Sequence, residues 1–180
     1  MSRFSIEHVL DQRSTHDDLF ADLRVVGLQR MARETRLSVA APRSYTRPLL
    51  IWVTRGQGRV VIGDETRGYG TNNVIFLPAG QVHGIDVPSA VLGQAVFLPD
   101  ARDLSWPEEP LLLRCRDGDL MTEVVVLVDL IQRMAAVRDD ESERAAYHAA
   151  GLVSVFLNRR RHQGGAAPAF ASARRGDTPD

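Results

Sequence analysis

Short apolar runs separated by turn residues fill the first half of the chain and limit what it can fold into. From Leu23 to Val96 the sequence alternates between β-rich runs, such as the strongly apolar Leu49–Thr54, and clusters of Gly, Pro, Asn or Asp. Gly63-Asp64 follows the run Arg59–Ile62 as a two-residue hairpin turn. Many short strands with turns this frequent favour a mainly β barrel or sandwich over a parallel α/β sheet. We therefore expect strands throughout this region, including the runs LRVVGL and RLSVAA.

The pattern changes after residue 100, where a proline-punctuated connector over residues 101–116 leads to a helix opening near Asp117–Asp119. Its apolar positions are spaced four and three residues apart, as in a coiled-coil seam. They are Leu120, Val124, Leu127, Ile131 and Met134. After an acidic turn a second helix covers about Glu143–Arg161. We predict an antiparallel helix pair over residues 117–162, with the seam forming a dimer interface.

The two ends of the chain differ from the rest. Residues 1–22 are polar and mixed, as in an N-terminal arm, and residues 163–180 are rich in small residues and proline, as in a flexible linker. The first residues contain no apolar signal core, and the longest apolar runs are too short to span a bilayer. The net charge of −1 gives no global basic field for nucleic acid, and the single cysteine, Cys115, suits a reducing compartment. We expect a cytoplasmic protein without a membrane partner.

The stretch RPLLIWVTRGQGRVVIGDETRGYGTNNVIFLPAGQVHGIDV, the run LGQAVFLP and the helix pair after them resemble the ligand-sensing half of AraC-type transcriptional regulators. The resemblance covers roughly Leu23 to His162. It implies a cupin (jelly-roll) barrel over residues 23–100 that binds a small effector, followed by the dimerisation hairpin. In that family a linker then leads to helix-turn-helix units, but nothing resembling them follows Arg161. We expect no direct DNA binding by this chain alone, and a second copy or a full-length relative as its partner.

His83, in the run FLPAGQVHGIDV, lies where metal-binding cupins supply one ligand. Such cupins also supply a His-x-His pair and a carboxylate from an earlier stretch, and a defined site needs three or four ligands. The chain's other histidines fall in the predicted arm and helices; they are His8, His16, His148 and His162. We therefore expect no metal and no other cofactor. His83 then either hydrogen-bonds a backbone group or contacts the effector.

Arg47 and the strand after it offer candidate effector contacts. An arginine at the entry to a barrel strand can hold a carboxylate or a diol through its two-pronged guanidinium, although a solvated surface position is the alternative. Strand alternation places Trp52 and Thr54 on one face, where the indole would be a platform inside the barrel or simply core.

The resemblance places Ile85, Leu92 and Gln94 at effector-side positions. Gln94 is the polar member, and it would either line the pocket or face solvent. Apolar Ile85 and Leu92 disfavour arabinose itself and favour a less polar effector, such as a small aromatic acid anchored by Arg47.

Two classes of function remain open from the sequence. The first is a sensing and dimerising module, without catalytic residues, for which the four-three seam is the distinguishing feature. The second is a metal-dependent cupin enzyme, such as a dioxygenase or isomerase, which requires a bound transition metal.

Overall fold

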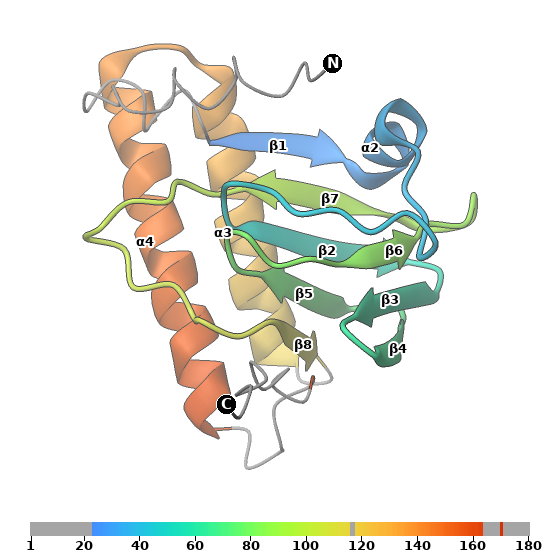
Figure 1. The fold of residues 1–180 in the computed structure, drawn as a ribbon. Coiled ribbons are helices and arrows are strands. Elements are labelled where there is room, and N and C mark those ends of the chain that lie inside the picture. The colour runs from blue at the N-terminus through green and yellow to red at the C-terminus, as the bar shows by residue number, and fades with distance from the viewer. Residues whose placement is uncertain (1–22, 116–117, 164–169, 171–180) are drawn as a thin grey trace, which may run out of the picture.

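Two antiparallel sheets and a helix pair form the molecule in the computed structural model, which describes residues 23–115, 118–163 and residue 170 (Figure 1). The larger sheet has five strands in the order β1-β7-β2-β5-β8, and the smaller has three in the order β4-β3-β6. The five strands of the larger sheet are β1 (Arg24–Gly27), β7 (Leu92–Phe97), β2 (Leu49–Arg55), β5 (Asn73–Leu77) and β8 (Leu111–Arg114). The smaller sheet contains β4 (Glu65–Tyr69), β3 (Gly58–Ile62) and β6 (Gly84–Asp86). The predicted mainly β class is confirmed by these two packed sheets.

The sheets enclose one apolar core, which we call the inner core. Alternate side chains of the larger sheet meet those of the smaller sheet there. Its buried members on the strands include Leu49, Ile51, Val53, Ile75, Leu77, Ala95, Phe97, Val60, Ile62, Tyr69 and Ile85. The predicted hairpin joins β3 to β4, and Gly63 takes a φ of +58° in its turn, a conformation that glycine adopts without steric cost.

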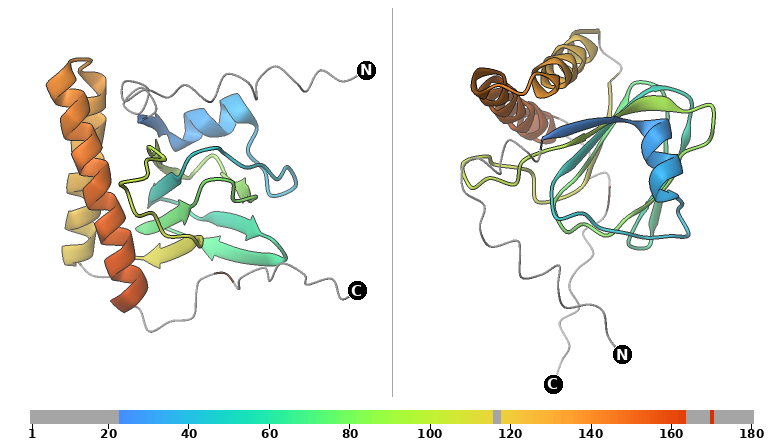
Figure 2. Two further views of the ribbon diagram at one scale, coloured as in Figure 1. Left: turned by 60° about the vertical axis from the view of Figure 1, so that its left-hand side comes forward. Right: turned by 90° about the horizontal axis from the view of Figure 1, so that it is seen from above.

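The helix pair covers the opposite face of the larger sheet, as Figure 2 shows from two directions. It consists of α3 (Gly118–Ala136) and α4 (Asp140–Gln163). Side chains from both helices join the outward-facing residues of the sheet in a second cluster, the helix-side core. Its members include Leu50, Val74, Phe76, Val96, Val124, Val128, Ile131, Ala149, Ala150, Val153, Phe156 and Leu157. The predicted helix pair is confirmed, although α4 begins before Glu143 because Asp139 accepts a hydrogen bond from the Ser142 N–H.

A short helix, α2 (Leu28–Thr35), occupies a region for which the sequence predicted only strands. It buries Leu28 and Met31, one turn apart, against the inner core. The side-chain amide of Gln29 donates to the carbonyl oxygens of Pro88 and Val91, at 2.7 and 2.6 Å, and so fixes the helix to the loop before β7. The all-strand prediction is wrong here. An eight-residue segment has only a weak tendency to form a helix by itself, but the burial of Leu28 and Met31 and the hydrogen bonds of Gln29 stabilise this one.

The run RLSVAA also forms no strand. It belongs to residues 36–48, which we call the crossing segment because they lead from α2 to β2. Turns and bends occupy its first part, and an isolated bridge pairs Arg43 with His83. In the predicted connector the structure adds β8, which pairs with β5 at the edge of the larger sheet. The predicted arm lies outside the described residues, as does most of the predicted linker, of which Phe170 is buried in the inner core.

Candidate ligand-binding site

A pocket of about 430 Å³ opens beside β1, where α2 and the crossing segment approach the edge of the larger sheet. The volume is in the range of cavities that hold small organic ligands. Apolar side chains and charged groups both line it. The lining residues are Arg24, Val26, Met31, Glu34, Thr35, Tyr45, Thr46, Arg47 and Phe97. We call this the β1 pocket.

Two arginines, Arg24 and Arg47, supply the positive charge of the β1 pocket. The Arg24 guanidinium lies over the Phe97 ring, 5.1 Å from its centroid, and Arg47 lies on the crossing segment beside Thr46. The third charged group is Glu34, whose carboxylate accepts a 2.7 Å hydrogen bond from Arg30. That hydrogen bond, with the nearby charges of Arg30 and Arg24, lowers the pKa of Glu34, so it stays ionised. The β1 pocket thus contains two guanidinium groups, those of Arg24 and Arg47, and one carboxylate, that of Glu34, which Arg30 partners.

Tyr45 joins this pocket to the buried His83. Its ring meets Phe97 edge-on at 5.3 Å between centroids and lies 5.6 Å from the imidazole of His83. The Tyr45 carbonyl oxygen accepts a 2.8 Å hydrogen bond from the Gly80 N–H, and the main chains of Arg43 and His83 exchange two further hydrogen bonds. The crossing segment is therefore fixed to the turn before β6, and the position of Tyr45 follows from that connection.

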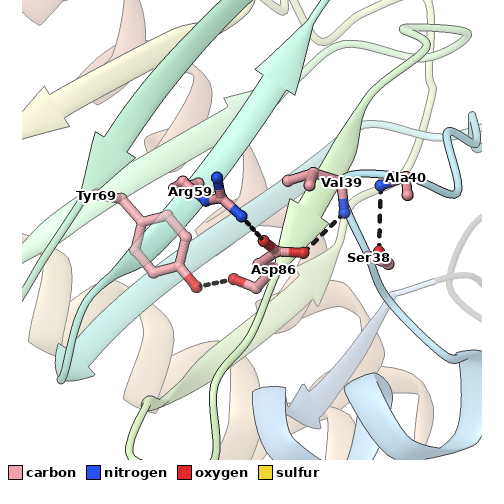
Figure 3. Close-up of polar contacts among 6 residues, drawn as sticks. All are labelled: Ser38, Val39, Ala40, Arg59, Tyr69 and Asp86. Carbon is pink, nitrogen blue, oxygen red and sulfur yellow. Dashed lines mark hydrogen bonds and ion pairs between the residues drawn. The ribbon is translucent and has the colours of Figure 1, made fainter.

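Asp86 fastens the earlier part of the crossing segment, as Figure 3 shows. One carboxylate oxygen accepts a 2.9 Å hydrogen bond from the Val39 N–H, and the other pairs with Arg59 at 2.8 Å. The Asp86 carbonyl oxygen accepts a hydrogen bond from the Tyr69 hydroxyl. Gly84 allows the close approach, since a Cβ atom there would lie 2.7 Å from the Val39 carbonyl oxygen. The hydrogen bond from Val39 is the main reason that the pKa of Asp86 lies below its ordinary value.

Three of the predicted site residues lie at the β1 pocket or on the inner side of the sheets. Arg47 lines the β1 pocket, and Ile85 and His83 are buried on the inner side, with 1% and 2% of their surfaces exposed. His83 Nδ1 lies 2.9 Å from the Gln81 carbonyl oxygen, which confirms the interpretation that this histidine hydrogen-bonds a backbone group. Direct effector contact by Arg47, His83 and Ile85 stays a prediction.

The alternative that Trp52 is simply core is confirmed, whereas its placement as a platform inside the barrel, with Thr54 beside it, is wrong. Trp52 packs against the helix-side core, and Thr54 is exposed beside an irregularity in the pairing of β2 with β7. Gln94 pairs with Trp52 across the two strands and shares its outward face, and Leu92 is 46% exposed. The helix pair covers this outer face of the larger sheet, and the indole of Trp52 packs beneath it.

The predicted dimer seam is largely internal. Val124 and Ile131 are 3% and 0% exposed in the helix-side core, and Leu127 and Met134 pack against it. Leu120 belongs to α3, but its side chain lies outside the described set. The prediction that this seam faces a partner is wrong for Val124 and Ile131, because the sheet and α4 already cover them. The exposed apolar residues of the pair lie elsewhere, at Val125, Val126, Leu152 and Val155.

Sequence reasoning missed Arg24, Glu34 and Tyr45. Arg24 and Glu34 join the pocket only because α2 folds back over β1, and α2 was not predicted. Tyr45 stands two residues before Arg47, but the chain bends at Thr46 and Arg47, so no strand alternation could have pointed to it.

A second hollow of about 960 Å³ lies at the turn before β6. Its lining includes His83, Glu109, Val61, Ile62 and Phe170. In the part of the chain that the structure describes, no group of three or more His, Cys, Asp or Glu side chains is placed to hold a metal ion. None of the described helices is long and apolar enough to cross a membrane.

Comparisons with known proteins bear on the fold. No protein-family model matches the chain, and no curated protein is significantly similar to it. Among solved structures, the AraC-like transcriptional activator CuxR aligns with a TM-score of 0.51 and 13% identity, over 86% of this chain and 56% of its own. The chain shares the fold of that part of CuxR.

Two other matches are more distant. ToxT from Vibrio cholerae aligns with a TM-score of 0.45 and 8% identity, over 84% of this chain and 60% of its own. A cupin-2 domain containing protein from Shewanella frigidimarina aligns with a TM-score of 0.32 and 10% identity, over 43% of this chain and 68% of its own. The chain thus spans little more than half the length of the AraC-like proteins it aligns with. Of the expected resemblance, the comparisons confirm the fold that the chain shares with this part of CuxR.

Proposed function

We propose that this chain is the effector-sensing and dimerisation module of an AraC-type transcriptional regulator, that it is not an enzyme, and that it binds a small organic anion in the β1 pocket. The observation that carries the proposal is the pair of arginines, Arg24 and Arg47, at a pocket with an otherwise partly apolar lining. A guanidinium holds a carboxylate through two parallel hydrogen bonds, and apolar walls select an organic anion over an inorganic one.

The signal would pass through β1. Val26 lines the β1 pocket, while its neighbour Val25 points to the opposite face and packs against the helix-side core. The helix α3 also contacts β1 directly. A ligand that holds β1 and α2 in one position therefore favours one packing of the helix pair, which is a shift between two populations of the same fold.

The proposed output surface is the exposed face of the helix pair. Val126, Leu152 and Val155 are 56%, 55% and 53% exposed, although apolar residues of this size are more often buried. We assign dimerisation to this face in place of the buried seam. Leu152→Glu should shift the protein from dimer to monomer in analytical ultracentrifugation, and Val82→Glu, at an equally exposed valine outside the helices, should leave it dimeric. A wild-type chain that stays monomeric at the highest concentration measured would contradict the dimer.

Calorimetry with benzoate, phenylacetate and octanoate tests anion binding. At least one carboxylate should bind the wild-type chain, and Arg24→Gln and Arg47→Gln should each weaken it by about tenfold or more, as expected for loss of a charged hydrogen-bond pair. Arg55→Gln is the matched control, since Arg55 is exposed at the end of β2 and does not line the pocket. Failure of all three acids to bind, or equal loss in the control, would refute the proposal.

A further inference from the structure

The second hollow, at the turn before β6, differs from the β1 pocket in the charge of its walls. Its volume of about 960 Å³ is enough for a small organic molecule. Four carboxylates line it together with apolar side chains, and none of the described residues that line it is an arginine or a lysine. The carboxylates belong to Asp64, Glu65, Glu108 and Glu109.

His83 adds a buried acceptor to the lining of the second hollow. Only 2% of this residue is exposed, and its Nε2 has no hydrogen-bond partner among the described residues. Nδ1 lies 2.9 Å from the Gln81 carbonyl oxygen, which only accepts, so Nδ1 carries the proton. Burial is the main reason that the pKa of His83 lies below its ordinary value, so the ring is neutral at pH 7. Nε2 is therefore an unpaired acceptor, which marks a place for a donor group.

The N–H groups of the lining side chains already have acceptors. Besides His83, the described lining contains one side chain with N–H groups, that of Gln81. Its amide donates to the Val82 carbonyl oxygen at 3.0 Å. The polar side-chain atoms that remain are the carboxylate oxygens and Nε2, all of which accept. A ligand that binds these side chains must therefore bring the donors.

Two arginines lie near the second hollow without lining it. Arg67 pairs with the carboxylate of Glu65. Arg43 is close enough for its charge to affect His83, but its guanidinium donates to the Arg36 carbonyl oxygen at 3.3 Å. Neither guanidinium is part of the described lining, so a positive charge inside the hollow would face carboxylates.

We propose that the second hollow binds an organic ammonium ion that donates to Nε2 of His83, with its charge facing the carboxylates and its hydrocarbon part against Val61 and Ile62. An ammonium group only donates, as these walls require, whereas a carboxylate only accepts. A neutral hydroxyl group could pair with Nε2 but would gain little from the carboxylates. The competing partner of Nε2 is an ordered water. The inference goes beyond the function proposed above and does not depend on it, because the two sites have different linings.

Calorimetry in low-salt buffer with benzylamine, phenethylamine and hexylamine tests the inference, because low salt screens charges least. At least one amine should bind the wild-type chain about fivefold or more tightly than the alcohol with the same carbon skeleton, which lacks the charge. In methyl NMR that amine should move the signals of Val61 and Ile62. The signals of Val26 and Met31, in the β1 pocket, should stay in place.

Two variants remove the proposed contacts separately. His83→Phe keeps a ring but removes Nε2, and it should weaken amine binding about tenfold or more, as expected for loss of a hydrogen bond to a charged group. The double variant Asp64→Asn/Glu108→Gln removes two exposed charges, so it should fold, and it should weaken binding about threefold or more. Glu141→Gln is the matched control, since Glu141 is exposed on α4 and does not line the hollow. If His83→Phe does not fold, the double variant decides.

Three results would overturn the inference. Equal affinity for an amine and its alcohol would mean that the hollow does not recognise the charge. Unchanged affinity in either folded variant, or an equal loss in Glu141→Gln, would place the amine elsewhere. If none of the three amines binds at millimolar concentration, an ordered water pairs with Nε2. All three results leave the proposed function standing, since that function is tested with carboxylates.

Discussion

Asp86 should contribute more to stability than its visible ion pair suggests, because its main partner is the backbone of the crossing segment. The N–H of Val39 donates to the carboxylate at 2.9 Å, and hydrogen bonds to a charged group contribute about 1.5–3 kcal/mol. The ion pair with Arg59 is 2.8 Å long, but the Arg59 side chain is 63% exposed, and such pairs contribute about 0–1 kcal/mol. Asp86→Ala should therefore lower the free energy of unfolding by about 2–3 kcal/mol, and Arg59→Ala by less than about 1 kcal/mol.

Urea unfolding followed by circular dichroism measures both variants. For a chain of this size about 2 kcal/mol corresponds to a fall in Tm of about 4–8 °C. The pKa of Asp86 is lowered in the folded state, so its contribution is present above the ordinary value of 3.8 and is lost as the pH falls through the folded value. The difference between wild type and Asp86→Ala should thus narrow in strong acid. Equal losses in the two variants at pH 7 would show that the ion pair, not the backbone hydrogen bond, is what matters.

Three further predictions concern the packing around the site. Ile131→Ala should cost about 2–5 kcal/mol in urea unfolding because Ile131 is fully buried, whereas Gln132→Ala, at an exposed position of the same helix, should stay within about 0.5 kcal/mol. Equal costs would contradict the assignment of helix faces. Burial lowers the pKa of His83, so as the pH drops below 6.5 this histidine takes up a proton in the unfolded chain before it does so in the folded chain. The free energy of unfolding should therefore fall with pH in this range. If it falls equally steeply in His83→Asn, this histidine is not the cause. Gly84→Ala should lower the free energy of unfolding by about 1–3 kcal/mol, because its Cβ would lie 2.7 Å from a main-chain oxygen. Gly68→Ala, whose Cβ would lie 3.9 Å from the nearest main-chain oxygen, should lower it less. A larger fall in Tm for Gly68→Ala than for Gly84→Ala would be incompatible with the packing described.

The sequence predicted the parts of the fold that arise from local sequence patterns. The hairpin at Gly63-Asp64 follows from turn chemistry, and the helix pair follows from apolar spacing, so both were predicted. In the structure, Leu50 and Trp52 share the helix-side face of β2, as strand alternation requires. Alternation could not tell which face is inside, because sheets and helices cover β2 on both sides and Leu49, Leu50 and Ile51 are all buried.

The candidate site was only partly predictable for a similar reason. Arg47 was recognised from its place at the start of a strand, but its neighbours in the β1 pocket come from separate segments. Their meeting depends on α2, an eight-residue helix that is too short to be stable or readily recognised without its tertiary contacts. The link between Tyr45 and His83 likewise arises from long-range pairing of Arg43 with His83, which no local pattern encodes.

Methyl NMR of the wild-type chain during a titration with benzoate tests the central claim, binding of a small organic anion in the β1 pocket. The signals of Val26 and Met31, which line that pocket, should move and saturate, while those of Val61 and Ile62, which line the second hollow, should stay in place. Saturable movement confined to Val61 and Ile62, or no movement of any methyl signal at millimolar benzoate, would contradict the account.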